Sequence, residues 1–155
     1  MVELSLKSSA FKHMGEIPSK YTCQGEEVNP PLEISGVSQN AKSLVLIMED
    51  IDPPMGRTIT HWVICHMDPK TDKILEGDSL ENAVVGKRML GKHKYMGPCP
   101  PKGQHRYVFK LLSVDEKLPL DSNSNKKKVM QVIEGHIIEQ TELIGIYQKQ
   151  KKTKE

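Results

Sequence analysis

The feature that most constrains the fold is a continuous apolar run at residues 44–48. A strand with one solvated face alternates apolar and polar residues, so an unbroken apolar run predicts a strand buried on both faces. The run is followed by two carboxylates, Asp50 and Asp52, and then by Pro53 and Pro54. The sequence therefore predicts a central strand that leads directly into a polar, rigid loop.

Five other segments predict strands, because they alternate apolar and polar residues or are rich in β-branched and aromatic residues. These segments are residues 2–6, 61–67, 83–85, 107–114 and 137–147. Residues 15–31 are rich in Gly, Pro and polar residues, which indicates short extended pieces and turns. Residues 78–103 also contain many Gly, Pro and short polar segments, which indicates a loop around the short strand at residues 83–85.

One helix is expected late in the chain. Val129, Met130 and Ile133 have the spacing of one helical face. Polar N-cap candidates precede them at residues 122–125, and Gly135 is a typical C-terminal stop. Because strands do not alternate with helices, a mainly β, single-domain β-sandwich is favoured over a doubly wound α/β fold.

The length of 155 residues suits one domain with a sizeable core. We assign residues 1–148 to this domain and expect the Lys-rich tail, residues 149–155, to be disordered. A net charge of +2 and an aromatic content of 5% argue against a nucleic-acid partner, which needs a basic surface and stacking platforms.

The expected location is the cytoplasm. No apolar stretch approaches the roughly 20 residues of a membrane span, and the N-terminus lacks the basic start and apolar region of a signal peptide. Cys23, Cys65 and Cys99 are odd in number and lack C-x-x-C spacing. This pattern fits free thiols in a reducing compartment better than a disulfide framework.

Asp50 and Asp52 project to the same side of an extended chain, where mutual repulsion disfavours ionising both. A cation, a histidinium or a ligand hydroxyl would stabilise such a pair, and either a metal or His61 could fill that role. Near a carboxylate, protonated His61 would be favoured and could bind an anion. Turn-forming aspartates and a structural strand histidine are the alternatives.

A second unusual segment spans residues 97–109. Its three prolines fix the backbone and remove donors, so the remaining N–H groups point in nearly fixed directions that suit an anion. His105 and Tyr107 are two apart at the start of a strand and share one face, whereas Arg106 faces away and is interpreted as an ion-pair or surface residue. A stiff loop without a ligand is the alternative.

Other catalytic patterns do not occur in the sequence. It contains no G-x-S-x-G nucleophile elbow, no P-loop and no G-x-G-x-x-G motif. The four remaining histidines lack metal-ligand spacing and are assigned structural or surface roles. They are His13, His66, His93 and His136.

Together these segments resemble the phosphatidylethanolamine-binding protein family, which includes Raf kinase inhibitor protein, and in particular its small prokaryotic branch. The first signature is D-I-D-P-P at residues 50–54, followed by T-H-W-V-I at residues 60–64. The second is Y-M-G-P-C-P-P-K-G-Q-H-R-Y-V-F at residues 95–109. Residues 17–32 and 133–147 resemble the beginning and the end of that branch.

The resemblance implies a β-sandwich with a Greek-key-like large sheet and a small cavity for phosphate, acetate or a phosphorylated head group. Family members are generally binding proteins, so we expect a non-catalytic protein without cofactor or metal. The resemblance assigns these residues to the anion site: Asp50, Asp52, His61, Gly97, Cys99, Pro100, His105 and Tyr107.

The expected roles within the site differ. His61 and Tyr107 would donate to the ligand. Asp50 would hold His61 or accept from a ligand hydroxyl, and Asp52 would brace the loop. Ile51 stands where the family usually has proline, so the turn between the carboxylates is expected to be less rigid. The long C-terminal helix of eukaryotic members is also missing, so kinase regulation of their type is not expected.

Three further expectations concern alternative functions and the oligomeric state. Inhibition of a serine protease through a surface loop is an alternative role implied by the resemblance. A Mg²⁺-dependent phosphatase is a remote alternative, because an apolar strand ending in D-x-D also begins that fold. A homodimer is expected, since a small sandwich can bury sheet or loop surface in a two-fold contact.

The last expectation concerns Cys99, which belongs to the anion-facing loop. Backbone N–H groups and nearby His61 would favour its thiolate, so Cys99 is predicted to react faster than Cys65 in a core strand. The alternative is that Cys23 and Cys99 are small buried thiols that fill gaps in the packing.

Overall fold

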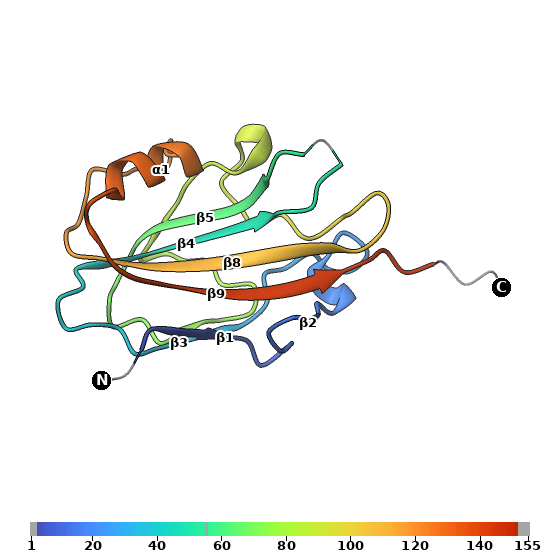
Figure 1. Ribbon diagram of the computed structural model, residues 1–155, viewed down its shortest axis with the longest axis horizontal. Helices are drawn as coiled ribbons and strands as arrows, with labels where there is room; N and C mark the ends of the chain where they lie inside the picture. Colours follow the sequence, from blue (N-terminus) through green and yellow to red (C-terminus); the bar gives the residue numbers. More distant parts are fainter. Residues whose placement is uncertain (1–2, 55, 152–155) are drawn as a thin grey trace.

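The computed structural model describes residues 3–54 and 56–151, and it shows two stacked β-sheets with a helix on the outer face of the larger one (Figure 1). The large sheet has the strand order β2 (Gly15–Glu16), β9 (Ile137–Tyr147), β8 (His105–Val114), β4 (Ser43–Asp50), β5 (Ile59–Met67), β7 (Val84–Val85). The small sheet has the order β1 (Ser5–Lys7), β3 (Leu32–Ser35), β6 (Lys73–Ile74). The helical elements are η1 (Ser19–Tyr21), η2 (Met89–Gly91) and α1 (Lys126–Ile133).

The strand β4 lies at the centre of two hydrophobic layers. Alternate residues of β4, including Leu46 and Met48, pack toward the small sheet in the main core. The others, Val45 and Ile47, join a second cluster with the buried face of α1, which presents Val129. All eight residues of β4 are buried, so the prediction of a strand covered on both faces is confirmed.

Strand pairing brings the two sequence segments together. The strand β4 lies between β5 and β8 and is antiparallel to both, and Asp50 is opposite Tyr107. The pairing of β4 with β5 shifts register between Met48 and Glu49, at the same end of the sheet. Because a register shift re-aims side chains at a strand end, the polar residues of β4, β5 and β8 meet there.

Most elements follow the predictions. The mainly β sandwich is confirmed, and α1 begins after Asn125, whose side chain accepts a hydrogen bond from Lys128 N at 2.9 Å. Gly135 lies beyond the end of α1 with a φ of 81°, as expected of a helix stop. The strands β3 and β6 were not predicted, because strands this short give little periodic signal.

The first and last residues of the chain lie outside the part that the structure describes. The first predicted strand, residues 2–6, is found at Ser5–Lys7, and Val2 lies outside the described residues. In the predicted tail, residues 149–151 are exposed and residues 152–155 lie outside the described part. Over residues 3–54 and 56–151, no helix is long and apolar enough to cross a membrane.

The cysteine prediction is wrong for two of the three residues. Cys23 and Cys99 form a disulfide with a Cα–Cα distance of 5.5 Å across 76 residues of sequence. Cys99 is therefore not a reactive thiol, and free thiols no longer support a reducing compartment. Cys65 is the free cysteine, and burial raises the pKa of its thiol to about 12. Local spacing could not reveal a pairing that depends on two distant loops.

Candidate functional site

Four buried polar or aromatic side chains meet at one end of the large sheet. They are Asp50 from β4, His61 from β5, and His105 and Tyr107 from β8. The Tyr107 ring meets His61 edge-on at a centroid distance of 5.4 Å, and it stacks on His105 at 6.4 Å. The sequence predicted all four as site residues, and we call them the histidine cluster.

Asp50 holds His105. Its Oδ2 accepts a hydrogen bond from His105 Nδ1 at 2.7 Å, and its Oδ1 accepts from the Asp52 backbone N–H at 2.8 Å. The two side chains are only 5% and 6% exposed. The expectation that Asp50 holds His61 is therefore wrong. Because a carboxylate is the acceptor, the proton sits on Nδ1 of His105 and its Nε2 is left for other partners.

His61 is held by the loop that follows η2. Its Nδ1 donates to the Met96 carbonyl at 2.7 Å, and the Met96 N–H donates back to the His61 carbonyl at 3.0 Å. This leaves Nε2 of His61 without a hydrogen-bond partner in the described part of the chain. Burial lowers the pKa of His61, and the charge of Arg88 lowers it further. The Met96 carbonyl and the charge of Asp50 raise this pKa, but their effect is smaller. His61 is thus mainly neutral at pH 7 and its Nε2 is an acceptor, so the structure does not support the expectation that a protonated His61 donates to the ligand.

The hydroxyl of Tyr107 is the unexplained group in the cluster. It is buried, and although the Asp50 carboxylate and the Cys99 amide lie close to it, neither has hydrogen-bond geometry with it. Burial, followed by the charge of Asp50, raises its pKa far above the ordinary range, so the group is a protonated O–H donor. An unpaired buried hydroxyl costs about 1–3 kcal/mol, so a missing partner such as a ligand oxygen or water is indicated.

Asp52 lies outside the cluster and pairs with Arg106. Arg106 donates to the Asp52 carboxylate from Nε at 2.8 Å, from Nη2 at 2.9 Å and from its backbone N–H at 2.9 Å. These bonds, opposed by partial burial, hold the pKa of Asp52 at about 2. The prediction that Arg106 is an ion-pair residue is confirmed, and these bonds tie the chain after β4 to the start of β8.

The proline-rich loop offers fewer donors than expected. The N–H of Gly97 already donates to Glu27 Oε2 at 3.1 Å. Gly97 is instead needed for packing, because a Cβ there would come within 2.6 Å of the Tyr21 carbonyl oxygen. Pro98, Pro100 and Pro101 have no N–H. Within residues 97–101, the amide of Cys99, which lies near the Tyr107 hydroxyl, is the donor left for an anion.

Arg88 was not predicted as a site residue from the sequence. This arginine is buried beside η2, where Nε donates to the Lys94 carbonyl at 3.1 Å and Nη1 donates to the Met89 carbonyl at 2.7 Å. Its charge lowers the pKa of His61, and the turn η2 that follows it packs against β5, the strand that carries His61. No motif distinguishes a single arginine in a loop, and only the three-dimensional arrangement relates it to His61.

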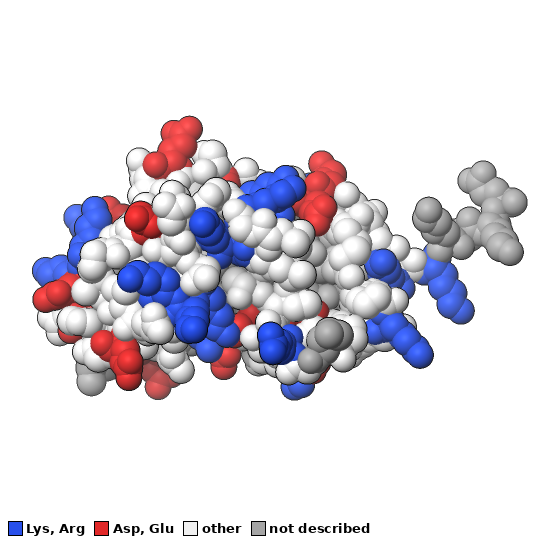
Figure 2. Space-filling model, turned by 90° about the horizontal axis from the view of Figure 1, so that it is seen from above, with Lys and Arg blue, Asp and Glu red and all other residues white. Residues whose placement is uncertain are grey.

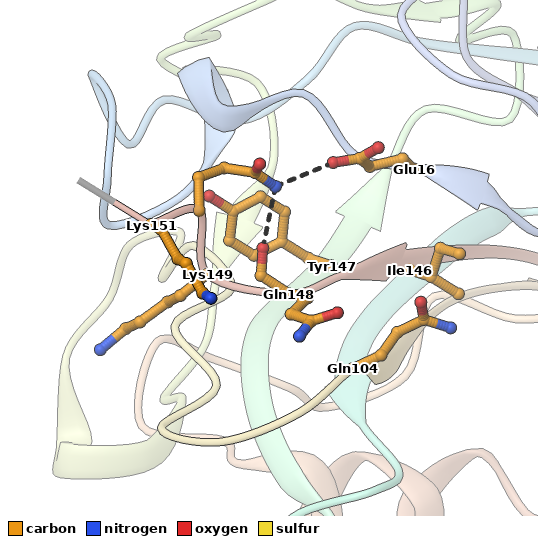
Figure 3. Close-up of a pocket in the computed structure, with 8 residues that line it drawn as sticks. Glu16, Gln104, Ile146, Tyr147, Gln148, Lys149 and Lys151 are labelled. Carbon is orange, nitrogen blue, oxygen red and sulfur yellow. Dashed lines mark hydrogen bonds between the residues drawn. The ribbon is translucent and has the colours of Figure 1, made fainter. Parts of the chain in front are cut away.

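A separate cleft begins beside the cluster, at the end of β9. Its volume is about 540 Å³, and Figure 3 shows the lining residues, which are Glu16, Gln104, Ile146, Tyr147, Gln148, Lys149, Gln150 and Lys151. Gln150 Nε2 donates to Glu16 Oε1 and to the Gln148 carbonyl, both at 3.1 Å (dashed lines in Figure 3). Tyr147 pairs with His105 across the sheet, so the cleft adjoins the cluster without sharing its side chains.

On the face seen from above, charges do not single out another site. Figure 2 shows Lys and Arg interspersed with Asp and Glu on the face seen from above. Among the residues that the structure describes, no three His, Cys, Asp or Glu side chains are arranged to hold a metal ion. Any selectivity of the cluster for a ligand would therefore come from the groups that line it.

The fold and the cluster define a β-sandwich protein with a buried polar site at one end of its large sheet. Residues 7–148 match the family described as phosphatidylethanolamine-binding protein. The chain belongs to this family, as the two signatures predicted.

Individual relatives agree with this assignment. A UPF0098 protein of Pyrococcus horikoshii is 42% identical over 95% of this chain and 78% of its own length. A UPF0098 protein of Methanothermobacter thermautotrophicus is 41% identical over 94% of this chain and 99% of its own. These relatives, together with the structures below, place the chain with the prokaryotic members.

Solved structures share the fold over nearly the whole chain. A phosphatidylethanolamine-binding protein homologue of Chlamydia trachomatis has a TM-score of 0.93 and 37% identity, covering 97% of this chain and 100% of that one. YbcL of E. coli has a TM-score of 0.87 and 26% identity, covering 96% and 100%. A carboxypeptidase Y inhibitor complexed with its cognate proteinase shows the same fold at 17% identity and a TM-score of 0.52, covering 92% and 81%.

Proposed function

We propose that this protein binds phosphate or a phosphorylated head group in the histidine cluster, without catalysing a reaction. The observation that carries the proposal is the buried, unpartnered hydroxyl of Tyr107 next to His61. A phosphate oxygen would accept from this hydroxyl, and the Cys99 amide would supply a second donor. Asp50 and His105 would keep the wall of the site in place, and Pro100 and Gly97 would shape its loop.

The state of Asp50 supports binding rather than phosphoryl transfer. Both carboxylate oxygens already accept hydrogen bonds, from His105 and from the Asp52 amide. A nucleophile needs a free lone pair directed at the substrate. The phosphatase alternative also requires strand–helix units that a β-sandwich does not provide.

Replacing Tyr107 by Phe removes one oxygen atom from the site and is expected to weaken phosphate binding about tenfold or more, because a donor to a charged ligand is lost. Isothermal titration with phosphate and with phosphoethanolamine measures the change. Tyr21→Phe is a matched control, since its hydroxyl donates to Glu76 at 2.6 Å, outside the cluster. Equal affinities for the Tyr107 and Tyr21 variants would contradict the proposed site.

Two expectations about partners remain predictions. Inhibition of a serine protease is suggested by the inhibitor that shares the fold, and a direct assay of the purified protein against such a protease would test it. In that assay, undiminished protease activity at a large excess of this protein would exclude the role.

A homodimer in solution is the other expectation, because a small β-sandwich can bury loop or sheet surface against a second copy. Light scattering at tens of micromolar protein should then give twice the mass of the 17.5 kDa chain. A monomer mass at that concentration would count against the dimer.

A further inference from the structure

The following inference rests on the proposed anion site. We propose that Arg88 supplies this site with a permanent positive charge, so that it binds phosphate dianion throughout the neutral and alkaline range. Arg88 would act as a specificity-determining residue that favours anions over neutral ligands.

Strand pairing brings the chain to the edge of β5 two residues before Arg88. The antiparallel pairing of β5 with β7 matches Ile64 with Val85, and the Gly86 N–H continues it by donating to the Val63 carbonyl at 2.9 Å. This pairing ends there, because the Lys87 N–H donates to the Ser124 carbonyl at 2.8 Å and Met96 takes the place opposite His61, so Arg88 lies two residues beyond the last contact with β5. The turn η2, which follows Arg88 directly, packs against β5.

Hydrogen bonds then fix the residue in this position. The Arg88 N–H donates to the Lys92 carbonyl at 3.0 Å, and the Arg88 carbonyl accepts from the Gly91 N–H at 2.9 Å. The side chain reaches across the turn to the Lys94 carbonyl, two residues before the Met96 that holds His61. Its Nη2 group has no hydrogen-bond partner in residues 3–54 and 56–151. One donor of the guanidinium thus remains for a ligand.

The charge of Arg88 is not balanced by a nearby carboxylate. The residue is 8% exposed, and no Asp or Glu within the described residues comes within 4.0 Å of its guanidinium. Carbonyl oxygens satisfy two of its donors but carry no net charge. Since burying an unpaired charge is costly, an anion beside Arg88 would stabilise the site.

The groups that face His61 explain why Arg88 matters for the pH range. They are Asp50 from β4, Tyr107 from β8, Glu27 from the loop before β3, and Arg88. Burial and Arg88 lower the pKa of His61, so this imidazole is mainly neutral from pH 7 upward. A guanidinium remains charged over this whole range. Binding of phosphate near pH 8 would therefore depend on Arg88 rather than on His61.

A purely structural role for Arg88 predicts different behaviour. If the side chain only braced the turn, Arg88→Lys and Arg88→Met would both loosen the loop, because neither replaces the two bonds to carbonyls. If its charge attracts the ligand, Lys should retain much of the affinity and Met should not. Arg88→Gln keeps a donor for one carbonyl without the charge, so it separates the two roles even if the Met variant fails to fold.

The test is isothermal titration of inorganic phosphate at about pH 8 into the wild type and the three Arg88 variants. Loss of a charge-assisted hydrogen bond should weaken binding about ten- to a hundredfold in the Met and Gln variants, and much less in the Lys variant. Arg57→Met is the matched control, since Arg57 is exposed, and its affinity should equal that of the wild type.

A second readout is the titration of the His61 ring by NMR in the phosphate-free protein. The pKa of His61 should rise in the Met and Gln variants and stay low in the Lys variant. Undiminished phosphate affinity in the Gln variant would overturn the role of Arg88 and leave the site itself intact. A wild type that binds no phosphate at all would instead overturn the proposed function and this inference together.

Discussion

Removing the disulfide between Cys23 and Cys99 is expected to lower the free energy of unfolding by about 4 kcal/mol. The bond closes a chain segment with a sequence separation of 76 residues, which is long enough for a large loss of entropy in the unfolded state. A chain-entropy estimate for a loop of this size gives about 4–5 kcal/mol, and removal of native disulfides commonly costs about 2–5 kcal/mol.

The same change should loosen the proposed site. The disulfide joins the loop after η1 to the proline-rich loop, and the Cys23 N–H also donates to the Pro98 carbonyl at 3.1 Å. The latter loop carries Met96, which holds His61. Phosphate binding should therefore weaken together with stability.

Urea unfolding of the wild type and of the Cys23→Ser, Cys99→Ser double variant measures the effect. The wild type should lose stability when a reductant is added, and the double variant should be insensitive to it. Free Cys65 provides the control, because Cys65→Ala leaves the disulfide intact and should preserve the sensitivity to reductant. A double variant as stable as the oxidised wild type would show that the cross-link contributes nothing.

The second large effect is expected from Asp50→Ala. This change leaves His105 buried without the carboxylate that accepts its hydrogen bond. The Asp52 N–H also loses its acceptor, Asp50 Oδ1. Removing one partner of a buried pair commonly costs about 3–5 kcal/mol, whereas an exposed pair contributes about 1 kcal/mol or less. Thermal or urea unfolding should show this difference between Asp50→Ala and Asp52→Ala.

Asp52→Ala is a suitable control because Asp52 is also a carboxylate paired with a basic residue, but its side chain is 29% exposed and that of Arg106 is 50% exposed. Its folded-state pKa of about 2 lies below the ordinary value of 3.8. Its small contribution should therefore be complete above about pH 4 and be lost as the pH falls toward 2. If Asp50→Ala cost no more than Asp52→Ala, the buried pair would not stabilise the protein as argued.

The sequence predicted the fold well where the signal is local. The unbroken apolar run at residues 44–48 and the β-rich run at residues 107–114 each reflect their own burial, so each strand could be recognised alone. The helix after Asn125 was recognisable from its cap and its apolar spacing. The strands β3 and β6 were missed because each has too few residues to show a period.

The sequence predicted that Asp50, His61, His105 and Tyr107 lie close together, but it did not predict their contacts. Asp50 follows one apolar run and Tyr107 begins another. Antiparallel pairing of β4 with β8 places these two residues opposite each other. Asp50 pairs with His105 and not with His61 because of the register between β4 and β8 and because the loop at Met96 already binds His61. The disulfide and the position of Arg88 depend on loops far apart in sequence, which no local spacing encodes.

A crystal structure of the protein with phosphate at neutral pH would show whether the anion occupies the histidine cluster. The phosphate oxygen atoms are expected within about 3 Å of the Tyr107 hydroxyl and of the Cys99 amide nitrogen. The Arg88 guanidinium is expected to contact the same anion. Phosphate bound instead in the cleft beside Lys149 and Lys151, with the Tyr107 hydroxyl still unpartnered, would contradict the proposed site.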